Sequence, residues 1–437
     1  MKTALDNFFD LTGLKTNVKR EILAGFTTFI SMAYILFVNP EILGASGMDK
    51  GAVFTATALA SAIGCLLMGL LAKYPIATAP SLGINAFFAY SVCIGMNIPW
   101  QTTLAGVFVA SIIFLLITVF KLRELIIDAI PADLKAAISA GIGLFIAFIG
   151  LQGGGLIVAN KSTLVGLGSF SGSTWVTVFG LIVVSILMVM RVPGAIFIGM
   201  VLSAIFGIAT GNIQMPHAFV APAPSMDQTF LVALSHLKDI NTLQMWVVVI
   251  TFLLVTFFDT AGTLIALAQQ AGFLQNNKMP RVGKALMSDS TAMLFGSLFG
   301  TSPVGAYVES SAGIAVGGRS GLTAVTTGIC FILGLFFSPL LTVVTSQVTA
   351  PALIIVGVLM AQSMARITWT KLEIAIPAFL TVAGMPLTYS ISDGLALGFI
   401  AYPITMIAAR KSKEVPALMY VLFFVFVIFF WVLNIEK

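Results

Sequence analysis

Residues 243–270 read LQMWVVVITFLLVTFFDTAGTLIALAQQ, an apolar run that contains no basic residue and a single carboxylate, Asp259. A helix rises about 1.5 Å per residue, so about 20 apolar residues are enough to cross the hydrocarbon core of a bilayer. The run therefore predicts a transmembrane helix. A carboxylate inside such a helix is costly, which makes Asp259 a candidate functional residue.

The rest of the chain has the same character. Hydrophobic residues make up 59% of the 437 residues and charged residues only 9%, whereas soluble domains carry about 25% charged residues. We predict an all-α polytopic protein of the cytoplasmic membrane, surrounded by the lipid bilayer, with two shorter segments near 122–131 and 350–366 lying along the membrane surface. Fourteen spans are expected near 20–43, 51–72, 78–97, 100–120, 133–151, 174–190, 193–209, 243–270, 282–300, 301–317, 320–345, 371–389, 392–409 and 416–434.

A polar stretch, residues 210–242, divides the chain near its middle and is expected to be a linker between two related halves, 1–209 and 243–437. The sequence RVPGA at 191–195, which opens the seventh span, is echoed by EVPA at 414–417, which opens the fourteenth. Seven spans per half would make the second copy enter the membrane from the opposite side. Such inverted repeats are common in secondary transporters and imply alternating access.

Basic residues indicate the orientation. Those of the first twenty residues share one side with Lys73 and with the 278–284 group, so the positive-inside rule places the N-terminus and the 271–284 loop in the cytoplasm and the 210–242 linker outside. Fourteen spans would put the basic residues near 366–371 and 410–413 outside, against that rule. We follow the repeat here, because early spans usually set the orientation. The net charge of +5 is explained by these loops and requires no nucleic-acid partner.

Three carboxylates lie inside expected spans: Asp259, Glu309 and Asp289. No basic residue occurs at comparable depth to neutralise them. A carboxyl that is removed from water without such a partner favours its protonated form and can exchange a proton during transport. Proton coupling is therefore the first hypothesis, a sodium site stays open, and the alternative for each residue is a carboxyl that only stabilises helix packing.

Two spans are interrupted by residues that suit a continuous helix poorly. APSLGIN at 79–85 lies in the third span and GTSPVG at 300–305 opens the tenth, which are equivalent positions in the two halves. Interrupted helices free backbone groups and helix N-termini for a ligand, and matching breaks mark the binding site of many transporters. The alternative is a pair of kinks used only for packing.

The residues after the breaks suggest the kind of ligand. Asn85, Phe87, Phe88 and Tyr90 follow the first break, and Glu309 follows the second. An amide that donates and accepts, a carboxylate and aromatic faces would suit a planar heterocycle with several N–H and C=O groups. Aromatic side chains in spans also serve simply as packing, so this set favours such a ligand without deciding it.

Other classes of function find little support. The phosphate-binding pattern GxxxxGK[ST] is absent, which argues against a primary pump. Both histidines, His217 and His236, lie in the polar linker, and no spacing typical of a metal, cofactor or hydrolase site occurs within the spans. An enzyme is therefore not expected, and a channel fits isolated carboxylates in two inverted halves poorly.

These stretches resemble the AzgA-like purine permeases of the nucleobase-cation symporter family. The similar strings run in order along nearly the whole chain, and the likeness is greatest to guanine/hypoxanthine permeases, as YPIA at 74–77 and PLTYS at 386–390 suggest. The main strings are REILAGFTTF (20–29), FVNP (37–40), NAFFAY (85–90), FDTAGTL (258–264), ESSAG (309–313) and GGRSGLTA (317–324).

The resemblance implies a core domain (spans 1–4 and 8–11) that carries a purine past a gate domain (spans 5–7 and 12–14), with short extended stretches in spans 3 and 10. It implies proton-coupled import of guanine or hypoxanthine. Adenine permeases share the NAFFA string, so adenine remains an alternative, as does a sodium-coupled transporter or channel for another small planar solute. The oligomeric state stays open, a homodimer included. The candidate substrate contacts are Asp259, Glu309, Asn85, Phe87, Thr260 and Ser302, and those for proton coupling are Glu309, Asp259 and Asp289.

Overall fold

The computed structural model describes residues 4–120, 130–273 and 279–435, most of which are helical. The segment expected near 122–131 falls almost entirely outside these residues. The first half contains α1 (Ala4–Phe9), α2 (Val18–Met32), α3 (Ile35–Gly44), α4 (Lys50–Leu67), η1 (Met68–Ala72), β1 (Thr78–Pro80), α5 (Leu82–Ala86), η2 (Phe87–Gly95), α6 (Trp100–Val119), α8 (Ala132–Gly153), β2 (Ile157–Asn160), β3 (Leu164–Leu167), α9 (Gly172–Val189) and α10 (Ala195–Ala209).

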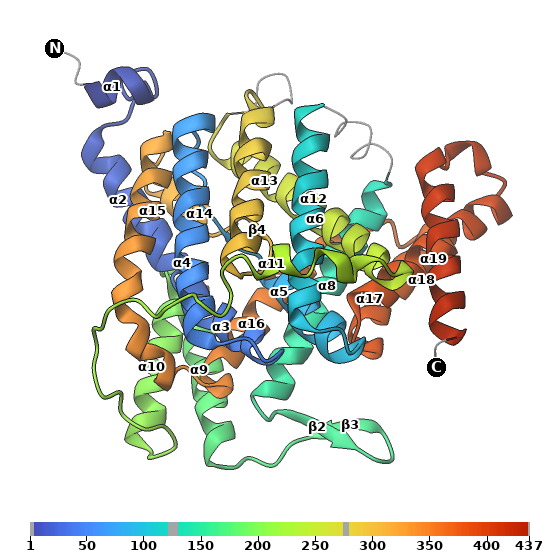
Figure 1. The fold of residues 1–437 in the computed structure, drawn as a ribbon, viewed down its shortest axis with the longest axis horizontal. Helices are drawn as coiled ribbons and strands as arrows, with labels where there is room; N and C mark the ends of the chain where they lie inside the picture. The colour runs from blue at the N-terminus through green and yellow to red at the C-terminus, as the bar shows by residue number, and fades with distance from the viewer. Residues whose placement is uncertain (1–3, 121–129, 274–278, 436–437) are drawn as a thin grey trace.

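The second half follows the 210–242 linker, which contains two short helical turns (Figure 1). The elements from the linker onward are α11 (Val232–Ser235), η3 (Leu237–Ile240), α12 (Leu243–Gln270), α13 (Val282–Phe299), β4 (Val304–Ala306), α14 (Ser310–Ala315), α15 (Gly321–Gly334), η4 (Leu335–Val343), α16 (Ser346–Ala361), η5 (Gln362–Arg366), α17 (Leu372–Thr388), α18 (Ile391–Ala408), η6 (Ser412–Glu414) and α19 (Ala417–Ile435).

Within the described residues, nine helical segments are long and apolar enough to cross a membrane. Four further apolar helices are shorter, and one of them, Leu82–Gly95, lies in the interrupted third span. The long segments include α12, which matches the 243–270 run from which the sequence predicts a span. The molecule is therefore an α-helical protein that can cross a bilayer many times, as its composition predicts.

Local sequence sets where these helices begin and end. The side chains of Asn17, Asp49 and Thr242 accept a hydrogen bond from a backbone N–H in the first turn of α2, α4 and α12, respectively, which satisfies donors that have no partner inside the helix. Gly300 ends α13 with a positive φ of 97°, and a Cβ there would lie 2.2 Å from Thr229. Only glycine fits that close approach, so the chain can leave α13 and enter β4.

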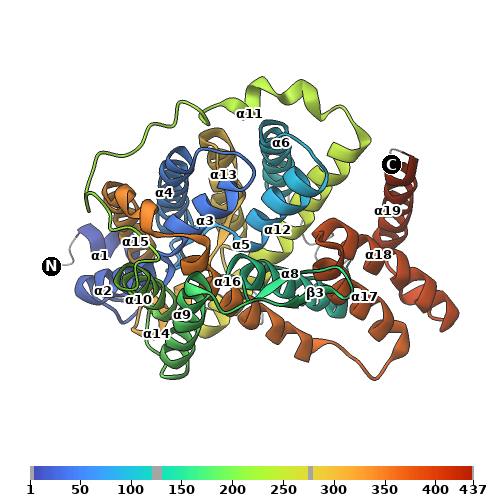
Figure 2. The ribbon, with the colours of Figure 1, turned by 90° about the horizontal axis from the view of Figure 1, so that it is seen from below.

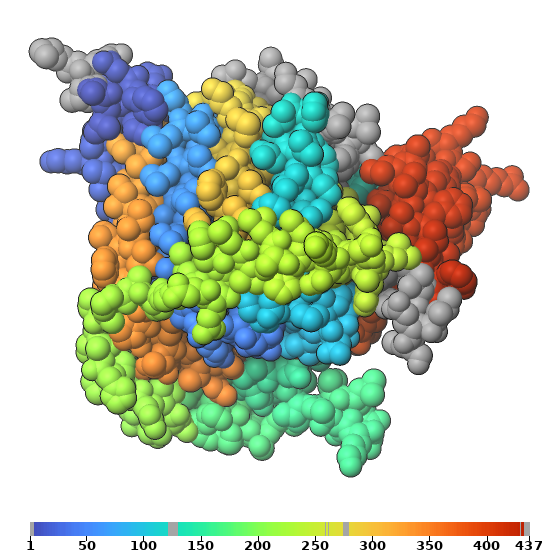
Figure 3. All heavy atoms as spheres, viewed as in Figure 1, coloured from blue at the N-terminus to red at the C-terminus, as the bar shows by residue number. Residues whose placement is uncertain are grey.

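The linker contacts one set of helix ends. It wraps around the outside of the helices in Figure 2 and forms a continuous band across the face shown in Figure 3. It binds the ends of helices that the sequence assigns to a single side of the membrane. The contacts are Thr55 Oγ1 donating to the Pro224 carbonyl at 2.9 Å, Leu231 N–H to Leu298 O at 2.7 Å and Ala221 N–H to Phe336 O at 3.0 Å.

A second group of contacts gathers the basic loops at the other ends of these helices. Lys73 donates to the Phe8 carbonyl at 2.7 Å, and the Arg281 guanidinium lies over the Tyr74 ring. The backbone N–H of Arg319 donates to the buried Glu21 carboxylate at 2.9 Å. The N-terminal segment and the loops near residues 73, 281 and 319 therefore share one end of the structure, as the orientation argument requires.

The segment near 350–366 differs from our expectation that it is short and lies on the membrane surface. With η5, α16 forms a segment of 21 residues, Ser346–Arg366, which is long and apolar enough to cross a membrane. It runs antiparallel to α8 over the whole of that helix. The contacts pair Gly154 with Ala350 and Gly143 with Met360, and the Asp133 carboxylate accepts from Thr368 N–H at 2.7 Å.

Small residues explain this packing. A Cβ added at Gly143 would lie 2.6 Å from Met360, so the backbones of α8 and α16 approach each other closely. Close contact of this kind is how helices associate in a bilayer, where there is no hydrophobic drive between them. A helix that matches an expected span along its full length belongs with the spans, so the surface placement of 350–366 is wrong.

The next two helices, α17 and α18, form an antiparallel hairpin beside α8. The far ends of the hairpin are joined by an ion pair between Lys411 and Glu373 at 2.5 Å, and Thr405 Oγ1 donates to the Glu373 carbonyl at 2.7 Å. At the tip, Tyr389 packs edge-on against Phe145 of α8. The last helix, α19, packs on α18 through the stacked rings of Phe399 and Phe426, and the three helices project at one side in Figures 1 and 2.

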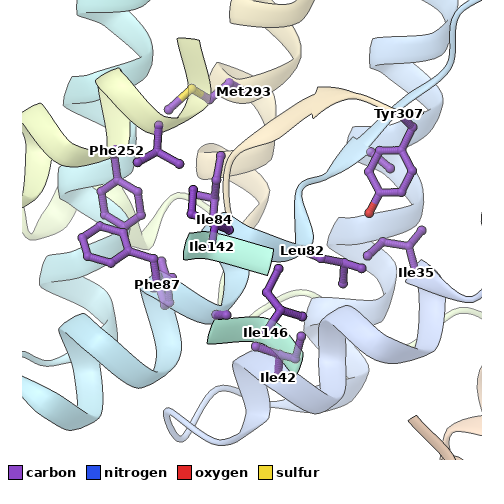
Figure 4. Packing of buried hydrophobic residues seen from close by; sticks show 14 of the residues in the cluster. Ile35, Ile42, Leu82, Ile84, Phe87, Ile142, Ile146, Phe252, Met293 and Tyr307 are labelled. Atoms are coloured by element: carbon purple, nitrogen blue, oxygen red, sulfur yellow. The ribbon is translucent and has the colours of Figure 1, made fainter. Parts of the chain in front are cut away.

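The main hydrophobic core lies where the third span meets α8 and α12. Leu82 and Ile84 of α5 face Ile142 and Ile146 of α8, while Phe87 meets Phe252 of α12 (Figure 4). This core surrounds the two interrupted segments and holds them in place.

Candidate functional site

The two interrupted segments meet inside the molecule. β1 and β4 pair antiparallel, with Thr78 opposite Ala306 and Pro80 opposite Val304. Backbone bonds continue the pairing on both sides, from Ser81 N–H to Pro303 O at 3.0 Å and from Tyr307 N–H to Ala77 O at 2.9 Å. Pro80 and Pro303 have no backbone N–H to donate within a helix. The strand pairing satisfies the neighbouring backbone groups, which a bilayer would leave without partners. A short helix follows each strand, α5 after β1 and α14 after β4.

Asp259 lies on α12 beside the first break. Its Oδ2 accepts a hydrogen bond from the Ser81 hydroxyl at 2.6 Å, and its side chain is partly exposed. Ser81 stands immediately before α5 but does not cap that helix. Its hydroxyl instead joins the break in the first half of the chain to the carboxylate of the second half.

Glu309 stands immediately before α14, after the second break. Its Oε1 accepts a hydrogen bond of 2.5 Å from the hydroxyl of Tyr34, a fully buried residue between α2 and α3. Glu309 itself is partly exposed. A second tyrosine, Tyr307, donates to the Pro80 carbonyl at 2.7 Å and so ties the two breaks together. Like Asp259, Glu309 is therefore held by a hydroxyl from the other half of the chain.

Asp289 and Thr260 form a separate pair behind the site. Asp289 on α13 is fully buried, and its Oδ2 accepts from the Thr260 hydroxyl at 2.7 Å. Its other oxygen, Oδ1, has no partner among the described residues. Neighbours in a helix point about 100° apart, so Asp259 faces the break while Thr260 faces α13. The structure thus directs Thr260 toward Asp289.

Asn85 and Ser302 meet directly, although they come from the two different breaks. Both are fully buried, and the Ser302 hydroxyl donates to Asn85 Oδ1 at 2.5 Å. Asn85 Nδ2 has no partner among the described residues. Asn85 also follows Ser81 by one helical turn, since its N–H donates to the Ser81 carbonyl at 2.9 Å.

Phe87 lies in the hydrophobic core. It is fully buried, and its ring meets that of Phe252 nearly edge-on, with 4.9 Å between the centroids (Figure 4). Its position in this structure is therefore one of packing, which keeps the start of η2 against α12.

The site therefore contains two partly exposed carboxylates, Asp259 and Glu309, each bound to a hydroxyl. In the part of the chain that the structure describes, neither forms an ion pair. Sequence reasoning did not find Ser81, Tyr34 or Tyr307. Ser81 stands inside the first break, so a hydroxyl at the start of a half-helix was an available signal, whereas nothing local marks the two tyrosines.

Comparison with known proteins decides the family. The sequence profile of the Permease family matches residues 19–397. The chain belongs to this family. It is 55% identical to the guanine/hypoxanthine permease PbuG of Bacillus subtilis over 98% of this chain and 99% of that protein. It is also 40% identical to the adenine permease AdeP of Escherichia coli, over 97% of this chain and 96% of that one. The chain is therefore a multi-pass membrane permease and not an enzyme.

Solved structures show the same fold at low sequence identity. The transmembrane domain of a cyanobacterium bicarbonate transporter, BicA, superposes with a TM-score of 0.61 at 15% identity, over 90% of this chain and 97% of that domain. The anion transporter Slc26a9 of the mouse, in its inward-facing state, gives a TM-score of 0.61 at 11% identity, over 94% of this chain and 72% of that one. The permease thus has the helical transporter fold of these proteins.

Proposed function

We propose that this permease imports purine nucleobases, guanine and hypoxanthine first among them, in symport with protons. The observation that carries this proposal is the pair of carboxylates, Asp259 and Glu309, held by hydroxyls at the paired breaks with no ion-pair partner among the described residues. Carboxylate oxygens accept hydrogen bonds from ring N–H groups, which purines offer. The names of the guanine/hypoxanthine permease PbuG and the adenine permease AdeP, two relatives of this chain, point to the same class of substrate.

The charge of the site supports a neutral substrate over an anion. BicA is described as a bicarbonate transporter, and its fold is shared by this chain. A fold hosts many functions, and the site decides among them. Two carboxylates without a basic neighbour would repel bicarbonate, whereas a neutral purine with N–H donors would be attracted.

Proton coupling is assigned first to Glu309. It stands immediately before α14 and is itself partly exposed, so it could exchange a proton and still share that proton with a bound ligand. Linkage then requires the substrate to bind more tightly as the pH falls. Asp259 and Asp289 are the next candidates, and a sodium ion held by carboxylate and carbonyl oxygens is the alternative.

Transport would follow alternating access between a core and a gate. We assign α2–α6 and α12–α15 to the core, and α8–α10 and α16–α18 to the gate. In two inverted repeats, α16 is the counterpart of α8 and α17 is the counterpart of α9. The contacts in the gate follow this relation, because α8 and α16 pack on each other, α9 packs on α16, and α17 packs on α8. This assignment makes α8 and α16 the first gate helices of the two repeats. The twelfth span is then α16 in place of the expected 371–389, and α19 lies outside the repeat.

Uptake into proteoliposomes with an imposed pH gradient tests the function. We expect the purified permease to accumulate radiolabelled hypoxanthine when the inside is alkaline, and to lose that accumulation with a protonophore. Equilibration without accumulation would indicate a channel. Accumulation that depends on a sodium gradient would indicate the alternative ion.

The choice among purines needs a separate measurement, because relatives named for guanine/hypoxanthine and for adenine both match the chain. Competition of unlabelled guanine, hypoxanthine and adenine against labelled hypoxanthine would rank them. Stronger competition by adenine would favour an adenine permease of the same family.

A further inference from the structure

A chain of buried polar side chains reaches Asn85 from outside the candidate site. It begins at Asn39 on α3, a residue with no role in the function proposed above, and passes through Ser302. Asn39, Thr57, Thr301, Ser302 and Asn85 are all fully buried. Buried amides and hydroxyls are expensive unless they are hydrogen-bonded, so the direction of each bond in this chain is constrained.

The orientation of Asn39 is fixed by its neighbours. The Thr57 hydroxyl donates its only proton to the Val53 carbonyl at 2.6 Å, so its oxygen can only accept from Asn39. Asn39 Nδ2 lies 2.7 Å from that oxygen and 2.8 Å from Thr301 Oγ1, which uses both of its protons. The Oδ1 of Asn39 is therefore a fixed acceptor, and it faces Ser302.

Ser302 has one proton and two amide oxygens within reach. It lies 2.5 Å from Asn85 Oδ1 and 3.4 Å from Asn39 Oδ1. In the observed arrangement it donates to Asn85, whose Nδ2 is left without a partner in the described part of the chain. If the Asn85 amide turned by half a rotation, Nδ2 would donate to Ser302, and Ser302 would donate to Asn39 instead.

We propose that Ser302, backed by Asn39, decides whether Asn85 presents its donor or its acceptor end to the purine. This inference rests on the purine transport proposed above. The shorter contact, from Ser302 to Asn85 Oδ1, leaves the Asn85 Nδ2 donor for the purine. That donor matches the C6 carbonyl of hypoxanthine and guanine. The turned amide presents its oxygen to the C6 amino group of adenine, with the longer contact between Ser302 and Asn39 as its support. Asn39 and Ser302 are thus positioning residues that set specificity through Asn85.

Binding of two purines to the purified, full-length permease tests the relay. The dissociation constants of hypoxanthine and adenine are measured for the wild type and for Ser302→Ala, Ser302→Thr and Ser297→Ala. We expect the wild type to bind hypoxanthine more tightly. Ser302→Ala should reduce the preference of the permease for hypoxanthine over adenine about three- to tenfold, the effect of one neutral hydrogen bond. Ser302→Thr keeps the hydroxyl and should keep the preference.

Ser297 supplies a matched control, because it is a fully buried serine on α13 whose hydroxyl, as far as the structure describes the chain, bonds only its own helix, at the Leu294 carbonyl. Its alanine variant should leave the ratio of the two constants unchanged. If Ser302→Ala fails to insert, Thr57→Val tests the relay from its other end. It releases Asn39, and an Asn39 amide turned with Nδ2 toward Ser302 no longer accepts the proton that the adenine arrangement requires. This variant should therefore raise the preference for hypoxanthine, opposite to the effect of Ser302→Ala.

The outcomes separate the relay from the function on which it rests. If the wild type binds neither purine, the proposed function fails. If it binds both and Ser302→Ala weakens both by the same factor, the residue is merely structural and the relay is refuted while the function stands. A wild type that binds adenine more tightly also overturns the relay.

Discussion

Replacement of Asp259 by Asn removes the charge at the centre of the candidate site and changes little else. The amide has nearly the volume of the carboxylate, and its oxygen can still accept the hydrogen bond from the Ser81 hydroxyl, which is 2.6 Å long in the wild type. That bond would then place the NH₂ group where the second carboxylate oxygen stood. We therefore expect the variant to insert and fold normally while it presents a donor to the ring N–H groups of a purine.

The loss in affinity can be bounded from the bond that disappears. A hydrogen bond to a charged group contributes about 1.5–3 kcal/mol, and about 1.4 kcal/mol corresponds to a factor of ten in the dissociation constant. Asp259→Asn should therefore weaken hypoxanthine binding by about tenfold to 150-fold. Ser81→Ala leaves the carboxylate in place but removes its anchor, so it should weaken binding by only about two- to tenfold.

Equilibrium binding of radiolabelled hypoxanthine to the purified variants measures these factors, and thermal unfolding of the same samples reports whether they are folded. The double variant should lose less affinity than the product of the two single losses, since both act on one hydrogen bond. An Asp259→Asn protein with wild-type stability and an affinity within about twofold of the wild type would refute the reasoning and return Asp259 to a packing role.

Three further outcomes follow from the structure. Glu309→Gln mimics the protonated acid, so it should still exchange labelled hypoxanthine across proteoliposomes but lose accumulation driven by a pH gradient; uphill uptake equal to wild type would move the coupling proton elsewhere. Glu41 on α3 accepts from the Ser346 hydroxyl at the start of α16 at 2.7 Å, so oxidising a Glu41→Cys, Ser346→Cys pair should block uptake until a reductant is added, whereas either single variant should be insensitive. A cysteine at the exposed Ser412 should react with an impermeant maleimide only after the membrane is permeabilised, and labelling of intact cells would contradict the topology argued below.

The sequence marks the two carboxylates and the two helix interruptions as candidate site features, because each is unusual for its local surroundings. Asp259 and Glu309 are charges in apolar surroundings, and Pro80 and Pro303 cannot continue a helix. The hydroxyls that hold the carboxylates are not unusual in this way. Tyr34 lies 275 positions from Glu309 along the chain, and a tyrosine inside an apolar span looks like ordinary packing until the fold brings it to its partner.

The same limit explains the misplaced helix. Pro351, Gly357 and Gln362 interrupt the apolar run near 350–366, so its uninterrupted apolar stretches are short. In the structure one continuous helical segment, Ser346–Arg366, includes these residues, and the glycines of α8 let the two backbones meet. Complementarity between helices that are far apart in sequence is a tertiary property, and hydropathy along one helix does not contain it.

One additional crossing also changes the side of every loop that follows it. If the chain crosses at α16, it returns to the N-terminal side at Arg366 and Lys371. The α17–α18 hairpin then leaves that side and comes back to it at Arg410 and its basic neighbours. The ion pair between Lys411 and Glu373 joins the two ends of this hairpin. The late basic clusters then obey the positive-inside rule that they seemed to break. A crossing at α16 would thus remove the contradiction between the charges and the repeat, and on this topology α19 would carry the chain from the cytoplasmic face toward the outside.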